Sequence, residues 1–172
     1  MPVKTRCLVT LAGTALAVIG ADQVTKAITV ATREGRPPVH LIGRVLTIDV
    51  SRNAGAAFSF APAATLIYTC VAVAVAAAIL INAPRLRSAA WAAALGLLLG
   101  GAIGNLCDRL ARAPGIGRGA VIDFIDLQHF ATFNIADSCL TCGAVLVVLL
   151  TLLGVPVNGR PATARNDAAT AA

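Results

Sequence analysis

The stretch SAAWAAALGLLLGGAIGNLCDR, residues 88–109, begins with an apolar run over 88–106 and ends in polar and charged residues. Crossing a bilayer takes about 20 mostly apolar residues, so this run predicts a membrane-spanning helix. Three other segments, 7–31, 62–82 and 135–155, have a similar length and character. The sequence therefore predicts an all-α membrane protein in which four transmembrane helices form a single domain over residues 1–157.

The composition is that of a membrane protein rather than a soluble domain. Hydrophobic residues make up 58% of the 172 positions, charged residues make up 13%, and the mean hydropathy is +0.82. The formal net charge is +6, but the basic residues are scattered and only 4% of residues are aromatic, so no stacking platform accompanies a basic stripe. We therefore expect membrane lipids around the chain and no nucleic-acid partner.

The first span could instead be a cleaved signal peptide, because Lys4 and Arg6 precede it and small residues follow. Helix-compatible sequence continues past Asp22 and Lys26 to residue 31, which favours a helix that stays in the mature protein. Four crossings place both termini on one side of the membrane. Basic residues are similarly numerous on the two sides, so the positive-inside rule does not decide the orientation. The short connection 84–87, together with Lys4 and Arg6, favours cytoplasmic termini.

The segments outside the spans differ in character. Residues 32–61 contain two β-rich stretches separated by Gly43 and Arg44, which predicts a small extracytoplasmic sheet at the membrane surface. Residues 111–133 begin with a turn-rich stretch and then become apolar with isolated acids, and we expect this outer loop to be partly helical. The tail 158–172 has no hydrophobic periodicity and is expected to be a disordered cytoplasmic segment.

With the termini inside, the polar residues near the span ends fall into one outer layer of the bilayer. They are Asp22, Lys26, Asn53, Asn105, Asp108, Arg109, Asp123, Asp126, Asn134 and Asp137. Ionisable groups at membrane depth are costly and commonly face a cavity or one another, so the layer is a candidate site. Asp22 and Lys26 are four residues apart and could simply form an ion pair along one helix face. The remaining acids outnumber Arg109, so at least one carboxyl must stay protonated or solvated.

Two neighbouring carboxyl groups cannot both ionise cheaply, because each raises the proton affinity of the other. The ionised member can then activate a water while the protonated member hydrogen-bonds a peptide carbonyl, which is the chemistry of aspartic peptidases. This chemistry needs no metal and no cofactor. His40 and His129 are the only histidines, and neither belongs to an HExxH pair, which disfavours a metallopeptidase.

Two other functions remain open at this point. Cys139 and Cys142 form a Cys-x-x-Cys pair, so a four-helix membrane thiol oxidoreductase can be considered. The pair lies inside an apolar helix without the strand-to-helix context of a redox domain, which favours ordinary packing. A small proton-coupled transporter is the second alternative. It would need polar residues through the full membrane thickness, whereas the inner halves of the spans are almost uniformly apolar.

Five motifs resemble, in order, those of the lipoprotein signal peptidases (signal peptidase II), the bacterial prolipoprotein aspartic peptidases. They are DQVTK at 22–26, NAGAAFS at 53–59, GGAIGNLCDR at 100–109, VIDF at 121–124 and FNIADS at 133–138. One such motif would be weak evidence. Five in the family's order, together with four spans, make a specific resemblance that covers most of the chain.

The resemblance implies that Asp123 and Asp137 are the catalytic dyad. It places Asn53, Asn105, Arg109 and Asn134 at the substrate, and gives a supporting role to Asp22, Lys26, Gly104, Asp108 and Ala136. It implies a substrate prolipoprotein whose lipobox cysteine carries diacylglycerol and is cleaved just before that cysteine. The enzyme is then expected to act as a single subunit in the bacterial plasma membrane, with its site near the extracytoplasmic face.

Overall fold

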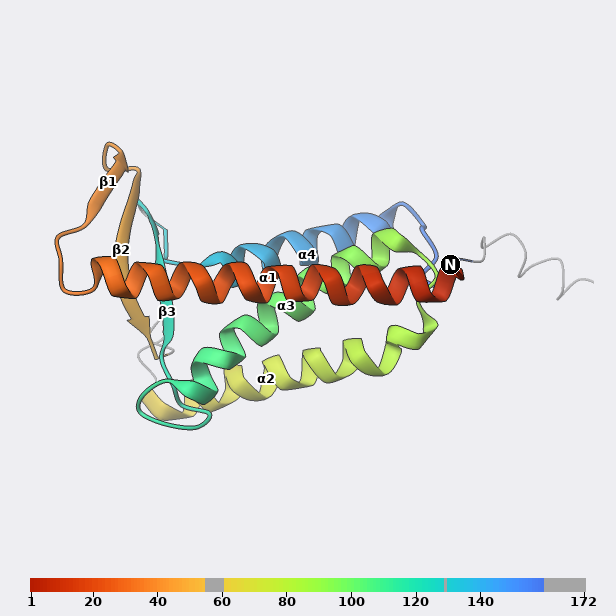
Figure 1. Cartoon of the computed structure of the whole chain (residues 1–172), viewed down its shortest axis with the longest axis horizontal. Coiled ribbons are helices and arrows are strands. Elements are labelled where there is room, and N and C mark those ends of the chain that lie inside the picture. Colours follow the sequence, from red (N-terminus) through yellow and green to blue (C-terminus); the bar gives the residue numbers. More distant parts are fainter. Residues whose placement is uncertain (55–60, 129, 160–172) are drawn as a thin grey trace, which may run out of the picture.

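Four long helices lie side by side in the part of the chain that the structure describes (Figure 1). The computed structural model describes residues 1–54, 61–128 and 130–159, with backbone only for 61–64. The helices are α1 (Val3–Arg33), α2 (Ala61–Asn82), α3 (Ala89–Ala111) and α4 (Ile135–Leu152), and a short 3-10 helix, η2 (Ala83–Arg85), follows α2. Each long helix has the length and apolar composition needed to cross a membrane, which confirms the predicted fold class.

The helix bounds differ from the predicted spans in ways that matter for the polar layer. α1 begins at Val3 and ends at Arg33, and α3 continues to Ala111, so Asp108 and Arg109 lie within the helix rather than after it. α4 ends at Leu152, because Gly154 takes a positive φ of 65° and Pro156 cannot continue a helix. Of the predicted disordered tail, residues 160–172 lie outside the described residues.

A three-stranded antiparallel sheet lies across one end of the bundle (Figure 1). Its strands are β1 (Val39–Ile42), β2 (Leu46–Asn53) and β3 (Val121–Leu127), in the order β1-β2-β3. The β-rich segment was predicted, but the outer loop that was expected to be partly helical contributes β3 instead. The β-branched and aromatic residues of VIDFIDL suit a strand whose first four residues are buried, and pairing with β2 satisfies its backbone.

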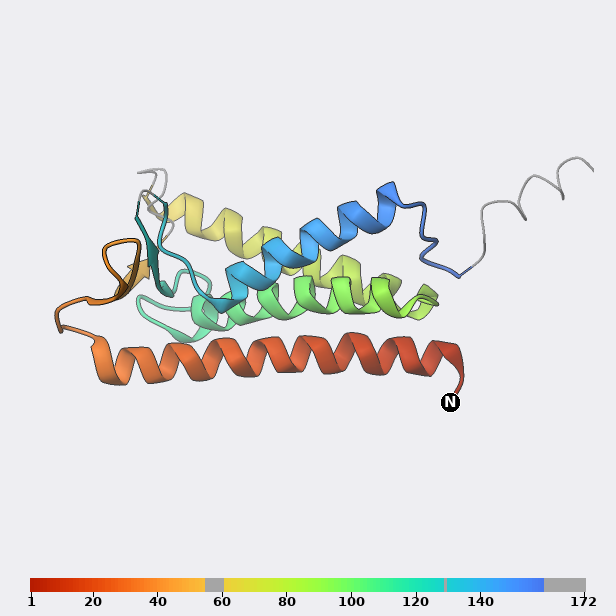
Figure 2. The same ribbon diagram turned by 90° about the horizontal axis from the view of Figure 1, so that it is seen from above.

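Glycines allow α3 to lie between α1 and α4, as Figure 2 shows. A Cβ atom at Gly100 would lie 2.6 Å from the Cβ of Val18 on α1, and one at Gly101 would lie 2.6 Å from the carbonyl oxygen of Ala136 on α4. Both distances are shorter than a Cβ atom tolerates. The three backbones can therefore approach this closely only because both positions carry a hydrogen atom in place of a side chain. The close approach brings the polar ends of α1, α3 and α4 together.

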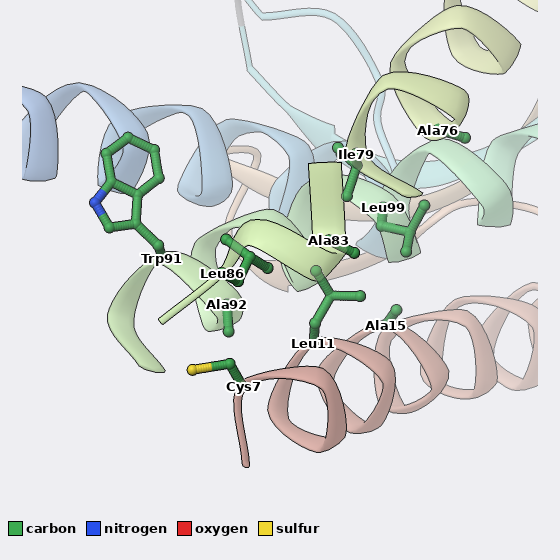
Figure 3. Packing of buried hydrophobic residues seen from close by; sticks show 10 residues of the cluster. All are labelled: Cys7, Leu11, Ala15, Ala76, Ile79, Ala83, Leu86, Trp91, Ala92 and Leu99. Atoms are coloured by element: carbon green, nitrogen blue, oxygen red, sulfur yellow. The ribbon is translucent and has the colours of Figure 1, made fainter. Parts of the chain in front are cut away.

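The apolar core (Figure 3) lies in the half of the bundle that is farther from the sheet (Figure 1). Its side chains come from the N-terminal half of α1, the end of α2, η2 and its flank, and the start of α3: Cys7, Leu11, Ala15, Ala76, Ile79, Ala83, Leu86, Trp91, Ala92 and Leu99. The Trp91 indole donates its Nε1 hydrogen to the carbonyl oxygen of Val155, 2.8 Å away, which satisfies its only polar group. Among the described residues, the buried charged side chains lie instead in the part of the molecule nearer the sheet: Asp22, Lys26, Asp108, Arg109 and Asp123.

Candidate active site

Asn134 connects the two aspartates that the sequence singled out. It caps α4: its Oδ1 accepts from the backbone nitrogen of Asp137 at 3.0 Å, and Asp137 Oδ2 accepts from the backbone nitrogen of Asn134 at 3.2 Å. This reciprocal capping box fixes the Asp137 side chain at the first turn of the helix. The Nδ2 group of the same asparagine donates to Asp123 Oδ1 at 2.6 Å. Both carboxyl groups therefore contact one fully buried amide residue.

The sheet places Asp123 at this point. In the antiparallel pairing of β2 with β3, Asp123 lies opposite Ser51 and Val121 lies opposite Asn53. The Asn53 side chain crosses to the neighbouring strand and donates from Nδ2 to Asp123 Oδ2 at 3.0 Å. Asp123 is 2% exposed and accepts one hydrogen bond on each carboxyl oxygen. Its position is thus defined by β2 and by the start of α4 together.

Asn105 on α3 holds Asp137 from the other side. Its Nδ2 donates to Asp137 Oδ1 at 2.7 Å, while its Oδ1 accepts from Lys26 Nζ at 3.0 Å and from Asn134 Nδ2 at 3.2 Å. The two donors at Oδ1 determine which end of the amide faces Asp137, because only the NH2 end can point toward the carboxylate. Three asparagines and two aspartates therefore form one connected network.

A buried ionic cluster supports the network. Lys26 is 0% exposed, and its Nζ lies 2.8 Å from Asp22 Oδ2 and 2.8 Å from Asp108 Oδ2. Asp108 Oδ1 also accepts from Arg112 Nε at 2.6 Å. The predicted pairing of Asp22 with Lys26 is confirmed. Asp108 pairs with Arg112, four residues later, and with Lys26 on α1, whereas it forms no salt bridge with Arg109 among the described residues. Two acids and two bases balance the formal charge of the cluster.

Gly104 and Ala136 allow this cluster to reach α4. Asp22 Oδ1 accepts from the backbone nitrogen of Ala136 at 3.0 Å, at the unpaired N-terminal turn of α4. A Cβ at Gly104 would lie 2.8 Å from Asp22 Oδ2 and 3.3 Å from the Ala136 Cβ. Small residues at both positions therefore let the Asp22 carboxylate pass between α3 and α4. The role is one of packing, as expected for supporting residues.

The buried position of Asp123 changes its acidity. Burial raises the pKa of Asp123 from 3.8 to about 6, because a low-dielectric environment disfavours the charged carboxylate. The hydrogen bonds from Asn53 and Asn134 oppose this rise in pKa, whereas the neighbouring Asp137 carboxylate adds to it. Asp123 therefore carries a proton at a pH at which an ordinary aspartate is ionised. The two carboxyl groups are near enough to interact electrostatically, so they titrate as a pair.

A cavity of about 320 Å³ opens beside Asp137. Its polar wall is formed by four residues that the sequence assigned to the site: Asn53, Asn105, Arg109 and Asp137. Its remaining wall comes mainly from α2 and is largely apolar: Tyr68, Val71, Ala72, Val75, Ala102 and Leu140. A cavity with one hydrogen-bonding wall and one apolar wall suits a substrate that carries both a peptide bond and hydrophobic groups.

Tyr68 is a lining residue that the sequence analysis missed. It is the only tyrosine in the chain, and its ring lies under the Arg109 guanidinium, with the Arg109 Cζ 5.6 Å from the ring centroid. The available sequence signal was a single aromatic residue in the outer half of an otherwise aliphatic span. Tyrosine at that depth also occurs as an ordinary membrane-interface anchor, so the signal did not single it out.

The other expected features of the polar layer can also be located. Asp126 lies on β3 opposite Thr47, and no hydrogen bond or salt bridge joins it to the asparagine network within the described residues. Cys139 and Cys142 are unpaired thiols on α4, the first partly buried and the second exposed. His129 and residues 55–60, which include most of the second motif, lie outside the described residues.

Comparison with known proteins identifies relatives over most of the chain. The family model described as signal peptidase (SPase) II matches residues 14–153. A lipoprotein signal peptidase of Streptomyces coelicolor is 50% identical over 138 residues, covering 80% of this chain and 68% of the relative. One from Mycobacterium tuberculosis is 42% identical over 153 residues, covering 89% and 76%. A bacterial membrane enzyme solved by the in meso method at 1.9 Å resolution superposes with a TM-score of 0.73 at 31% identity, covering 83% and 92%.

Proposed function

Because the chain belongs to the signal peptidase II family, we propose that it is an aspartic endopeptidase that removes signal peptides from diacylglyceryl-modified prolipoproteins. It cleaves immediately before the lipidated cysteine. The observation that carries the proposal is the shared contact of Asp123 and Asp137 with Asn134, which holds two carboxyl groups together next to a partly apolar cavity that Asp137 lines. Lipoprotein processing is the activity named for the curated relatives, and the multi-pass helical fold fits a substrate anchored in lipid.

The chemistry follows from two carboxyl groups that share one proton. The ionised group takes a proton from a water whose oxygen attacks the scissile carbonyl carbon, while the protonated group donates a hydrogen bond to the carbonyl oxygen. When the tetrahedral intermediate collapses, the carbon–nitrogen bond breaks and a proton passes to the leaving nitrogen. That nitrogen becomes the α-amino group of the lipidated cysteine. Asn53, Asn105 and Asn134 keep both carboxyl groups in place throughout.

The position of the site suits a lipid-anchored substrate. The dyad lies where the sheet meets the outer ends of α3 and α4, so a diacylglyceryl group in the adjacent leaflet brings the scissile bond to the level of the carboxyl groups. The apolar wall from α2 faces hydrophobic parts of the substrate, and Asn53, Asn105 and Arg109 face its peptide groups. We assign this end to the extracytoplasmic side of the plasma membrane, with both termini in the cytoplasm. One subunit contributes every residue of the proposed site.

The substrate class can be tested with purified protein in detergent and a synthetic lipobox peptide, with a chelator present. We expect cleavage of the diacylglyceryl peptide at the bond before the modified cysteine, identified by the product masses. The matched control is the same peptide with an unmodified cysteine, which lacks the membrane anchor and should be cleaved at least about tenfold more slowly, since burying acyl chains contributes roughly 0.8 kcal/mol per CH2 group. Equal cleavage of both peptides would contradict the proposed substrate class.

The two alternative functions are addressed by the same assay. Replacing Cys139 and Cys142 together by Ala should leave cleavage unchanged, because neither thiol joins the asparagine network, whereas a thiol oxidoreductase would lose its activity. A transporter would need a polar path across the bundle. Within the described residues, the buried charged side chains all lie in the part of the molecule nearer the sheet, which supports the peptidase over the transporter.

The raised pKa of Asp123 predicts the pH dependence of cleavage. The ratio kcat/KM reports groups of the free enzyme, so it should fall about tenfold per pH unit once the pH exceeds the pKa of about 6 and the pair loses its shared proton. The same shift stabilises the fold below the unfolded pKa of 3.8, and this contribution is lost as the pH rises through about 6. Thermal unfolding measured at each pH separates the two effects. A kcat/KM that rises steadily from pH 6 to pH 8 would contradict the assignment.

A further inference from the structure

Arg109 is a buried cation whose side chain makes no hydrogen bond to any other described residue. The residue is only 8% exposed, and its Nη1 atom is buried with no hydrogen bond to the part of the chain that the structure describes. No carboxylate lies within salt-bridge distance of it in the described part of the chain. Its one recorded side-chain contact there is the Tyr68 ring, 5.6 Å from the guanidinium carbon. Both residues line the cavity that contains Asp137.

The contrast with Lys26 shows that this is unusual within the same molecule. Lys26 is buried at the same end of the bundle, yet it has two carboxylates and an amide oxygen as partners. A buried charged donor that lacks a partner costs free energy, so such groups are usually compensated. The acid next to Arg109 in sequence, Asp108, is already occupied by Lys26 and Arg112. Because Arg109 lines the cavity, its guanidinium is the unpaired cation that a ligand filling the cavity would meet.

The Tyr68 ring can hold the guanidinium without using its donors. A cation over the face of an aromatic ring interacts with the π electrons, whereas the N–H groups of arginine point outward in the plane of the guanidinium. Stacking therefore limits where the side chain can move and does not use the N–H groups of the guanidinium. The turn of α2 that carries Tyr68 is fixed from the other side, because the buried Thr69 donates from Oγ1 to the carbonyl oxygen of Gly117 at 2.9 Å.

We propose that Tyr68 is a positioning residue that holds the Arg109 guanidinium at the wall of the cavity so that the guanidinium donates to a carbonyl oxygen of the bound substrate. This inference rests on the proposed peptidase function. The ligand atom is a carbonyl oxygen because a peptidase substrate presents neutral acceptors, and the dyad already supplies the negative charge of the site. A diacylglyceryl peptide contains two kinds of carbonyl group with this chemistry: those of the peptide bonds near the scissile bond and those of the acyl esters of the lipid.

The test compares three variants in binding and in turnover. Binding of the uncleaved diacylglyceryl lipobox peptide is measured with the Asp123→Asn background, and kcat/KM with the otherwise intact enzyme. Tyr68→Leu should weaken both by about tenfold, within the range of a desolvated cation–π contact. Tyr68→Phe, which keeps the ring, should restore both. Ile67→Ala, on the same turn of α2 but 62% exposed, is the matched control and should behave as the parent.

A double-mutant cycle distinguishes positioning from general packing. If Tyr68 acts through Arg109, Tyr68→Leu should have no further effect once Arg109 is replaced by Ala. A peptide with a dialkyl ether lipid, which lacks the ester carbonyls, then identifies the acceptor. If Tyr68→Leu no longer weakens binding of this peptide, the acceptor is an ester carbonyl; if it still does, the acceptor is a peptide carbonyl. If Tyr68→Leu and Tyr68→Phe behave equally, or if the losses add to those of Arg109→Ala, the positioning role of Tyr68 is contradicted while the proposed peptidase function stands. A parent protein that neither binds nor cleaves the peptide would overturn the proposed function and this inference with it.

Discussion

Replacing either Asp123 or Asp137 by Asn is expected to reduce cleavage of a diacylglyceryl lipobox peptide by about 10²–10⁴-fold, the range contributed by a general acid or base. An amide is similar in shape to a carboxyl group but neither accepts the water proton nor donates a proton to the carbonyl oxygen. The pair shares one proton, so losing either member removes both functions, and the two losses should not add in the double variant. Single-turnover rates with purified variants in detergent measure the effect.

Asp126→Asn is the matched control for this experiment. It lies on the same strand as Asp123, three residues further along β3, and undergoes the same change of charge and size. It makes no contact with the asparagine network within the described residues, so its variant should cleave at the parent rate. The thermal unfolding of all three variants shows whether each one is folded. Full activity in a folded Asp123→Asn or Asp137→Asn variant would remove that residue from the dyad.

The four helices and the polar layer could be predicted because the bilayer imposes simple length and polarity requirements on a sequence. A span must be about 20 apolar residues long, and a charge within it is costly, so unbroken apolar runs and isolated charges are both informative. The sheet could be predicted only in part. β3 pairs with β2 across roughly 70 residues of chain, with Asp123 opposite Ser51. Nothing local to VIDFIDL specifies this pairing, so the stretch was expected to be partly helical.

Partner choice within the polar layer depends on helix rotation, which sequence distance does not reveal. Successive residues of an α-helix are turned by about 100°, so neighbours such as Asp108 and Arg109 point in different directions. In the structure Asp108 faces Lys26 on α1, whereas Arg109 faces Tyr68 on α2. The helical periodicity alone argues against an ion pair between these two adjacent residues. Which helix each residue contacts depends on how α3 packs against its neighbours, and the sequence alone does not show this packing.

Replacing Lys26 by Met is expected to destabilise the folded protein by about 3–5 kcal/mol, the usual cost of removing one partner of a buried ion pair. Methionine fills a similar volume, so packing is largely preserved, but the Asp22 and Asp108 carboxylates lose their shared cation. The Asn105 Oδ1 also loses one of its two donors, which weakens the constraint on the amide that holds Asp137. Thermal or denaturant unfolding in detergent measures the stability, and kcat per folded molecule measures the effect on the site.

Two further variants separate the loss of a buried cation from the loss of any lysine. Lys4→Met removes an exposed lysine from the same helix and should change the unfolding free energy by less than about 0.5 kcal/mol. Adding Asp22→Asn to Lys26→Met removes one unpaired carboxylate and keeps the Oδ1 acceptor for the Ala136 backbone nitrogen, so part of the stability should return. If Lys26→Met is as stable as Lys4→Met, the lysine is not compensating the two acids. The buried ionic cluster would then have to be held by Arg112 and the backbone alone.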